Sequence, residues 1–378
     1  MCKSTLDCLL VPGAGCRVQP RSPWLGSPPD FRDQIHKTPA AHLSTKSLFQ
    51  KMPIRAPSAL RFPVSKPFLS PVGVRYNSSS SAQTVISSFL NNKSNPALSP
   101  IETTELLSPT HSHLLSTTLQ PYLPFALAPA KNVLPQGHHI VHFPTAAVDE
   151  SRLDADGTET TYNPGSPFNR RMWAGGRIHW SRNTDLRIGQ NIREKMELDK
   201  IEAKKRGGGG EMVVMSIRKT LFTPSNEEAV SETRQWVFLK DGDASAAAAS
   251  KTKKPAPQTE KRETVFEHTV GLTPTALFRY SALIFNSHAI HLNKEHCLKE
   301  GHPNLVVHGP LTLSLLLEAV RGTHDGQWKE MTYRAVGPAY VGEQLRLNVG
   351  PKKDGKVEAW AEKGEGVPVM KVGFEFWE

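Results

Sequence analysis

The chain contains 378 residues, of which 38% are hydrophobic and 30 are prolines, and its formal net charge is +10. This length allows two domains or one large domain behind a tail, while the modest apolar share and the prolines predict that part of the chain lies outside a core. The positive charge is concentrated in residues 34–101, which contain eight Lys and Arg residues but no Asp or Glu, and about +2 remains elsewhere. Because no zinc-ligand spacing, basic recognition helix or RNA-binding aromatic motif accompanies this charge, nucleic-acid binding is not expected.

The cysteines and the hydropathy exclude two further classes. Cys2, Cys8 and Cys16 lie close to the N-terminus, and Cys297 is the remaining cysteine. A disulfide framework is therefore not expected in the body of the chain, which fits a reducing interior or an organelle matrix, and Cys297 is expected to be a small, half-buried thiol. No run of eighteen apolar residues occurs, so no membrane-spanning helix is predicted.

Residues 1–98 are rich in Pro, Ser, Lys and Arg and show no sustained apolar period, which predicts a disordered tail. Within it, residues from about 52 to 76 are basic, free of acidic residues and rich in hydroxyl groups, which is the composition of a mitochondrial targeting segment. Three Asp residues spoil this pattern further upstream, so the sequence leaves open whether translation starts at Met1 or at Met52.

Residues 99–241 are predicted to form a first folded half. A helix is expected to start behind Ser99-Pro100, because acidic residues follow at once and apolar residues recur to about Leu119. Residues 133–144 predict a short extended segment with a turn. Three histidines in this segment invite a metal site: His138, His139 and His142. No carboxylate or cysteine stands near them at ligand spacing, so no metal site is predicted.

From Arg170 the chain is predicted to form long strands. Gly175-Gly176 indicate a bulge or a close backbone approach in the first strand, and Trp173 is a candidate for lining a cavity. Further strands are expected over residues 185–204, 211–223 and 229–240. Glycines and a Pro-Ser-Asn turn separate these runs, which favours an antiparallel meander. The low-complexity residues 242–262 then predict a linker.

Residues 263–378 are predicted to form a second half with the same order of elements. A strand over residues 263–270 precedes a helical region, and three further strand regions close the chain, over residues 328–349, 357–361 and 367–377. Each half thus supplies a helix and a meander, which is typical of one α+β unit used twice and not of a parallel α/β sheet.

The centre of the second half is a helix that is apolar on every side. Seven of the residues from Leu311 to Val320 are Leu, Ala or Val and cover nearly all angular positions, so the helix must be buried. Pro310 suits its first position, and Gly309 allows close approach. The free amides of Gly309 and Leu311 can direct a partial positive charge at the oxygen of a thioester enolate.

Two motifs flank this helix start and carry a resemblance. The sequence Asn-Ser-His-Ala-Ile-His ends at His291, and Val-Val-His-Gly-Pro-Leu follows about fifteen residues later. This pair resembles the hydratase motif of the MaoC-like, type 2 hydroxyacyl-thioester dehydratases, and Arg-Arg-Met-Trp-Ala-Gly-Gly-Arg from Arg170 resembles their non-catalytic half. The resemblance covers roughly residues 100–378. It implies an α+β double hot-dog fold of two antiparallel sheets, each with a helix, the C-terminal central helix fully buried.

The resemblance also implies roles for individual residues. The family uses an Asp and a His five residues apart to hold a water, and His291 matches that His as general base. Asn286 occupies the Asp position, and an amide can orient water but cannot exchange protons as a carboxylate does. Either His288 shares the proton transfer or His291 carries out both steps. His308 is expected to shape the turn before the helix more than to react.

The expected function is the reversible dehydration of (3R)-3-hydroxyacyl thioesters to trans-2-enoyl thioesters. The resemblance implies an acyl-thioester substrate, acyl carrier protein as partner, fatty-acid synthesis in the mitochondrial matrix and no metal or other cofactor, and it is compatible with a homodimer. Three alternatives stay open: a mesaconyl-CoA-type hydratase of a branched dicarboxylic CoA ester, a hot-dog thioesterase, and a non-catalytic acyl-binding scaffold.

Overall fold

The computed structural model describes residues 81–127, 132–144, 148–206, 209–241 and 262–378. The predicted targeting segment and nearly all of the predicted linker lie outside these residues. Within the described part, no helix is both long and apolar enough to cross a membrane.

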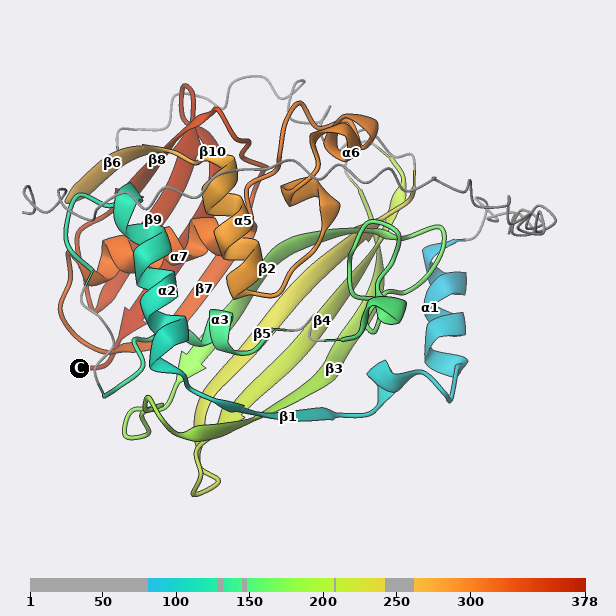
Figure 1. The fold of residues 1–378 in the computed structure, drawn as a ribbon, viewed down its shortest axis with the longest axis horizontal. Helices are drawn as coiled ribbons and strands as arrows, with labels where there is room; N and C mark the ends of the chain where they lie inside the picture. Colours follow the sequence, from blue (N-terminus) through green and yellow to red (C-terminus); the bar gives the residue numbers. More distant parts are fainter. Residues whose placement is uncertain (1–80, 128–131, 145–147, 207–208, 242–261) are drawn as a thin grey trace, which may run out of the picture. The chain divides into compact units, whose positions relative to one another are not determined.

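The ten strands of the described chain form one antiparallel sheet (Figure 1). They are β1 (Ile101–Leu106), β2 (Arg170–Trp180), β3 (Asn191–Lys205), β4 (Glu211–Phe222), β5 (Glu228–Leu239), β6 (Phe266–Gly271), β7 (Trp328–Ala335), β8 (Gln344–Val349), β9 (Lys356–Lys363) and β10 (Val367–Phe376). Their order across the sheet is β1-β3-β4-β5-β2-β7-β10-β9-β8-β6. The predicted meander of the first half is confirmed, because β3, β4 and β5 pair in sequence as antiparallel neighbours.

The sheet order shows that the two halves repeat one arrangement. Reading outward from the centre, β2, β5, β4, β3 and β1 on one side correspond to β7, β10, β9, β8 and β6 on the other. The two predicted sheets are joined where β2 pairs with β7, from Gly175↔Arg334 to His179↔Glu330. The predicted bulge is present, since the pairing of β2 with β5 shifts register between Trp173 and Gly175. A repeated unit of this kind is the double hot-dog fold that the sequence predicts.

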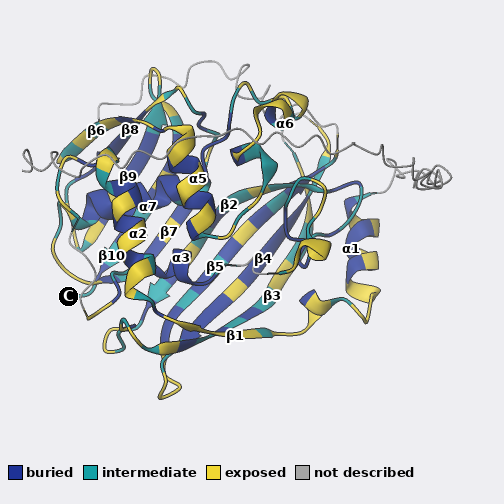
Figure 2. Cartoon of the chain, in the orientation of Figure 1, coloured by how far each residue is buried: buried dark blue, intermediate teal, exposed yellow. Residues whose placement is uncertain are grey.

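The helices distinguish the halves. They are α1 (Ala82–Asn91), α2 (Pro109–Leu119), α3 (His139–His142), α5 (Pro274–Leu283), α6 (Lys294–Lys299) and α7 (Gly309–Arg321). The α7 helix packs against β8, β9 and β10, and all its residues from Leu311 to Val320 are buried. Figure 2 shows the body of α7 in dark blue, while α2 and α5 keep an exposed side. The predicted buried central helix is therefore confirmed in the second half.

In the first half the corresponding helix is very short. The turn at Gly137 leads into α3, which has four residues. The prediction of an extended segment over residues 133–144 was therefore wrong at this point. A separate core fills the first half instead, in which α1 and the loop residues Tyr162 and Phe168 pack with side chains of β3, β4 and β5.

Two boundaries differ from the sequence predictions at the start of the fold. Residues 101–106 form the edge strand β1, which pairs with β3, and the helix begins at Pro109. The β-branched Thr103 and Thr104 suit an edge strand, and this pairing outweighs the helix-start signal of the acidic residues. The α1 helix lies inside the segment predicted as a tail, so the folded part begins before residue 98. Four residues of α1 are buried. The amphipathic run that they form is short and lies within a polar segment, so the sequence did not predict this helix.

Candidate active site

A cavity of about 1530 Å³ lies at the junction of the halves. Its lining includes Asn286, His288 and His291 from the segment before α6, Gly309 from the start of α7, and Asp156 and Trp173 from the first half. A cavity of this size has room for a ligand larger than a typical drug-sized molecule. The structure thus brings most of the candidate site residues to one wall of one cavity.

His291 is the best-defined group in this wall. It ends a 3₁₀ turn, Ala289–His291, and its side chain is buried. Its Nδ1 lies 2.7 Å from the carbonyl oxygen of Val306. A carbonyl only accepts hydrogen bonds, so Nδ1 carries the proton and Nε2 holds a lone pair. Burial, and then the nearby His288, lower the pKa of His291 to about 3, which keeps the ring neutral at physiological pH.

The ring of His308 packs against the ring of His291. The two rings stack with centroids 3.6 Å apart and an interplanar angle of 22°. Nε2 of His308 hydrogen-bonds to Ser281 Oγ at 2.9 Å, and Nδ1 is buried without a hydrogen-bond partner among the described residues. Burial and the neighbouring His291 hold the pKa of His308 well below its usual value. These contacts fit a residue that positions His291 and shapes the helix start.

Asn286 closes a turn. Its Oδ1 accepts a hydrogen bond of 3.0 Å from the backbone N–H of His288, and its own N–H donates to the carbonyl of Ser281 at 2.8 Å. The side-chain oxygen is therefore engaged within the turn, and the amide nitrogen is the part of the side chain left for a ligand. This local bond is typical of an Asx turn. Asn286 thus fixes the direction in which His288 leaves the backbone.

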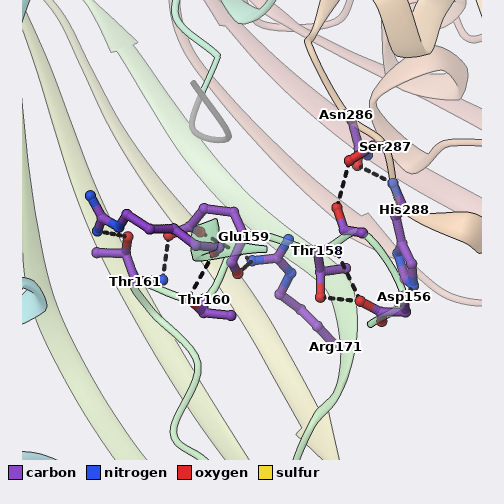
Figure 3. Close-up of polar contacts among 11 residues, drawn as sticks. Asp156, Thr158, Glu159, Thr160, Thr161, Arg171, Asn286, Ser287 and His288 are labelled. Atoms are coloured by element: carbon purple, nitrogen blue, oxygen red, sulfur yellow. Dashed lines mark hydrogen bonds and ion pairs between the residues drawn. The ribbon is translucent and has the colours of Figure 1, made fainter. Parts of the chain in front are cut away.

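His288 faces a carboxylate that the sequence analysis did not identify. Its Nε2 lies 3.2 Å from Oδ2 of Asp156, which stands in the loop before β2 of the first half. Figure 3 shows the two side chains pointing toward each other from separate segments of the chain. The rings of His288 and His291 are 5.6 Å apart and nearly perpendicular. The site therefore contains two imidazoles from the second half and one carboxylate from the first.

The N-terminus of α7 forms another part of the cavity wall. His308 is the N-cap residue and Pro310 occupies the first turn, as predicted. Gly309 packs so closely against Trp173 that an added Cβ would lie 2.4 Å from Cε3 of the indole. Leu311 is fully buried and is not among the residues that line the cavity, so of the two candidate oxyanion positions the structure brings Gly309 to the cavity wall and leaves Leu311 in the core. Gly309 lies beside Trp173, which stacks on Tyr333 with ring centroids 4.6 Å apart.

The histidines of the first half make contacts with other side chains. His138 pairs with Glu318 of α7 at 2.8 Å, and His142 pairs with Ser112 of α2 at 3.0 Å. Burial and neighbouring histidines lower the pKa of His142 to about 3. Among the described residues, no three His, Cys, Asp or Glu side chains are arranged to hold a metal ion. These histidines anchor the short α3 region to its neighbours.

Comparison with known proteins identifies the family of the chain. Residues 137–341 match the family model described as hydroxyacyl-thioester dehydratase type 2. The chain belongs to this family. It is 31% identical over 234 residues to the mitochondrial hydroxyacyl-thioester dehydratase type 2 of Schizosaccharomyces pombe, covering 57% of this chain and 77% of that protein. It is 29% identical over 263 residues to the mesaconyl-C(4)-CoA hydratase of Chloroflexus aurantiacus, covering 69% and 89%.

Solved structures share the fold. A MaoC-like dehydratase from Phytophthora capsici matches with a TM-score of 0.54 at 15% identity, covering 78% of this chain and 98% of that one. HtdX of Mycobacterium tuberculosis matches with a TM-score of 0.52 at 12% identity, covering 74% and 100%. The predicted fold and family are therefore confirmed. Membership of the hydroxyacyl-thioester dehydratase type 2 family identifies this protein as a hydro-lyase.

Proposed function

We propose that this protein reversibly dehydrates (3R)-3-hydroxyacyl thioesters to trans-2-enoyl thioesters, with acyl carrier protein as the carrier. The observation that carries the proposal is the buried, neutral His291, whose Nε2 lone pair is left for a ligand because Nδ1 donates to Val306. A base held in this way, beside a helix N-terminus and in the wall of a cavity, suits removal of the proton next to a thioester carbonyl.

In the proposed reaction, His291 both takes up and returns the proton that is transferred. Its Nε2 takes the proton from C2, and the electron pair of that C–H bond passes into the enolate of the thioester. The amide of Gly309, at the N-terminus of α7, stabilises the enolate oxygen. The C3–O bond then breaks as the enolate collapses to the enoyl thioester, and the departing oxygen takes the proton from His291. Water leaves, and His291 returns to its neutral form.

The composition of the first 98 residues and the relative in fission yeast support a mitochondrial setting. The segment from about 52 to 76 has a targeting composition, and the Schizosaccharomyces pombe relative carries mitochondrial in its name. We therefore place the reaction in the mitochondrial matrix, as a step of fatty-acid synthesis. In this proposal, residues 99–241 form the non-catalytic half and residues 263–378 form the catalytic half.

A dicarboxylic CoA ester is the second candidate substrate, because the mesaconyl-C(4)-CoA hydratase matches over 89% of its length. A second carboxylate requires a cation in the acyl part of the cavity. Two arginines that line the cavity already have acidic partners: Arg171 lies 3.5 Å from Glu159, and Arg234 lies 2.8 Å from Glu232. This pairing leaves Arg171 and Arg234 less available to a second carboxylate, while Arg334, which also lines the cavity, is the cation to test for binding one.

The proposal is tested with crotonyl thioesters of CoA and of acyl carrier protein and with mesaconyl-CoA. Hydration removes the ultraviolet absorbance of the enoyl thioester, and the carrier-protein ester is expected to give the largest kcat/KM. His291→Ala is expected to lower kcat by about 10²–10⁴-fold because the base is lost. His113→Ala, on the exposed side of α2, serves as the control. Release of free thiol, or a folded wild type without activity on any ester, contradicts the proposal.

A further inference from the structure

The loop of the first half that carries Asp156 is a tight turn. The N–H of Gly157 donates to the carbonyl of Asp154 at 2.8 Å, and the N–H of Asp154 donates to the carbonyl of Thr158 at 2.7 Å. Gly157 has a φ of +80°, a conformation that glycine adopts at little cost. The turn therefore presents Asp156 at its tip in a defined direction.

Two hydrogen bonds to backbone carbonyls join this turn to the segment of the second half that carries His288. The N–H of Ala289 donates to the carbonyl of Asp156 at 2.7 Å, and Ser287 Oγ donates to the carbonyl of Gly157 at 2.7 Å. A Cβ on Gly157 would lie 2.4 Å from the carbonyl oxygen of Ser287. The two segments thus meet backbone to backbone, and their side chains are fixed relative to each other.

Both oxygens of the Asp156 carboxylate have partners. Oδ1 accepts from the N–H and the Oγ1–H of Thr158, at 2.8 and 2.5 Å, and Oδ2 faces Nε2 of His288 at 3.2 Å (Figure 3). Burial alone would raise the pKa of Asp156, but the bonds from His288 and Thr158 outweigh it and hold the pKa well below its ordinary value. An ionised carboxylate only accepts, so Nε2 of His288 carries the proton.

We propose that Asp156 is a positioning residue of the active site, which takes over through His288 the orienting task that a carboxylate at position 286 would perform. This inference rests on the proposed function. By accepting from Nε2–H, Asp156 leaves the lone pair of His288 on Nδ1. The site then contains two imidazole lone pairs, on His288 Nδ1 and His291 Nε2, that hold the two hydrogens of one water.

The arrangement gives the water a defined orientation for both directions of the reaction. In hydration, one O–H bond donates to His288 Nδ1 and the other to His291 Nε2, so a lone pair of the oxygen can be directed at C3. His291 takes one proton as the C3–O bond forms, and the same proton passes to C2. His288 keeps its proton on Nε2 throughout, and the Asp156 carboxylate prevents the other tautomer from forming.

The position of the pair separates this role from a purely structural one. The side chains of His288 and Asp156 are 12% and 24% exposed, and both residues line the cavity. The buried ion pair of Glu318 with His138, at 6% and 5% side-chain exposure, lies away from that cavity lining. An acid and an imidazole that border the substrate cavity can act on a bound water, whereas the Glu318 pair can only hold elements together.

The test compares Asp156→Asn with wild type in the hydration of crotonyl thioesters. Asparagine keeps the size of the side chain, but its amide can turn its nitrogen toward His288 and favour the wrong tautomer. We expect kcat to fall by about 10²-fold with KM changed less than about threefold. Glu150→Gln removes an equal charge from an exposed position near the same loop and is expected to match wild type. Circular dichroism and the thermal midpoint confirm that each variant is folded.

A double-mutant cycle decides whether Asp156 acts through His288. If it does, Asp156→Asn has no further effect in a His288→Gln background, whereas independent effects multiply. Thr158→Val removes one donor to Asp156 and is expected to lower kcat less than Asp156→Asn does. Equal activity of Asp156→Asn and wild type, or multiplicative effects in the cycle, overturns this inference alone. An inactive wild type would overturn the proposed function as well, so the two failures are distinguishable.

Discussion

Substitution of Gly309 by alanine tests whether the contact between the halves sets the geometry of the site. Gly309 has a backbone conformation that alanine can adopt, and alanine at a helix start would ordinarily stabilise the fold by about 0.4–1 kcal/mol. In this structure the added Cβ would lie 2.4 Å from Cε3 and 3.0 Å from Cζ3 of Trp173. The sign of the effect therefore depends on whether the indole can move.

The surroundings of Trp173 indicate that it cannot move without cost. Its ring stacks on Tyr333 at 4.6 Å, and the hydroxyl of Tyr333 donates to the buried Glu232 at 3.2 Å. An ordinary carbon contact of about 3.5–4 Å requires a shift of roughly 1 Å. Overpacking of this kind costs about 1–3 kcal/mol, which exceeds the gain from removing glycine. We expect Gly309→Ala to lower the free energy of unfolding by about 1–2 kcal/mol.

Chemical denaturation measures this change, and the hydration assay measures its consequence at the helix start. Gly350→Ala is the control, because the nearest atom to its added Cβ is at 3.4 Å. Combining Gly309→Ala with Trp173→Leu is expected to recover part of the lost stability, since the smaller side chain leaves room for the methyl group. If Gly309→Ala were as stable as wild type and equally active, the contact between Trp173 and the helix start would not restrain the site, and the reasoning would be refuted.

Two further predictions concern the second half. Cys297 is fully buried, its Sγ–H donates to the carbonyl of Ile290 at 2.9 Å, and burial raises the pKa of its thiol. In a variant with the three N-terminal cysteines replaced by serine, we therefore expect a thiol reagent to react with Cys297 only when the protein unfolds. Rapid reaction of the folded protein would contradict this expectation. Burial would raise the pKa of Glu318, but His138 and Arg321 outweigh this effect and lower the pKa below its ordinary value. The ionised carboxylate therefore stabilises the fold at pH values above the pKa that Glu318 has in the unfolded chain, and this stabilisation is lost as the pH falls. Glu318→Gln should therefore cost about 1–3 kcal/mol at neutral pH and flatten the loss of stability on acidification, as measured by urea unfolding at several pH values.

The second half was predictable because its signals are local. A helix that is apolar on every side can only be central, and alternating strands with glycine turns on both sides of it can only wrap around it. The first half was predicted less well, because its core does not have this form. The α1 helix depends on contacts with β3 and β4, and the short α3 depends on contacts with α2, none of which a local pattern encodes. The β1 segment is a strand because β3 provides an edge to pair with.

The residues of the candidate site also fall into a group that the sequence predicted and one that it did not. The motif around His291 and the Gly-Pro helix start predicted residues that the structure brings to one cavity wall, because these residues lie close together in the sequence. Asp156 was not predicted. The Asp-Ala-Asp-Gly sequence indicates a turn, but nothing within it shows that the turn lies against residues 130 positions later. Long-range placement of a loop depends on the register of the whole sheet, and the joint between β2 and β7 fixes that register here.

The shortness of α3 and the presence of Asp156 at the site have one structural cause. In the second half, α7 ends at Arg321 and β7 begins at Trp328, so the chain passes almost directly from helix to strand. In the first half, α3 ends at His142, Pro144 prevents continuation of the helix, and β2 begins only at Arg170. The described residues 148–169 between them contain no α-helix, and the turn at Asp156 and Gly157 reaches across the junction to residues 287–289. A full helix in the first half would occupy part of the cavity that residues near α3 now line and would move Asp156 away from it, so the short helix leaves both the space and the carboxylate at the junction of the halves.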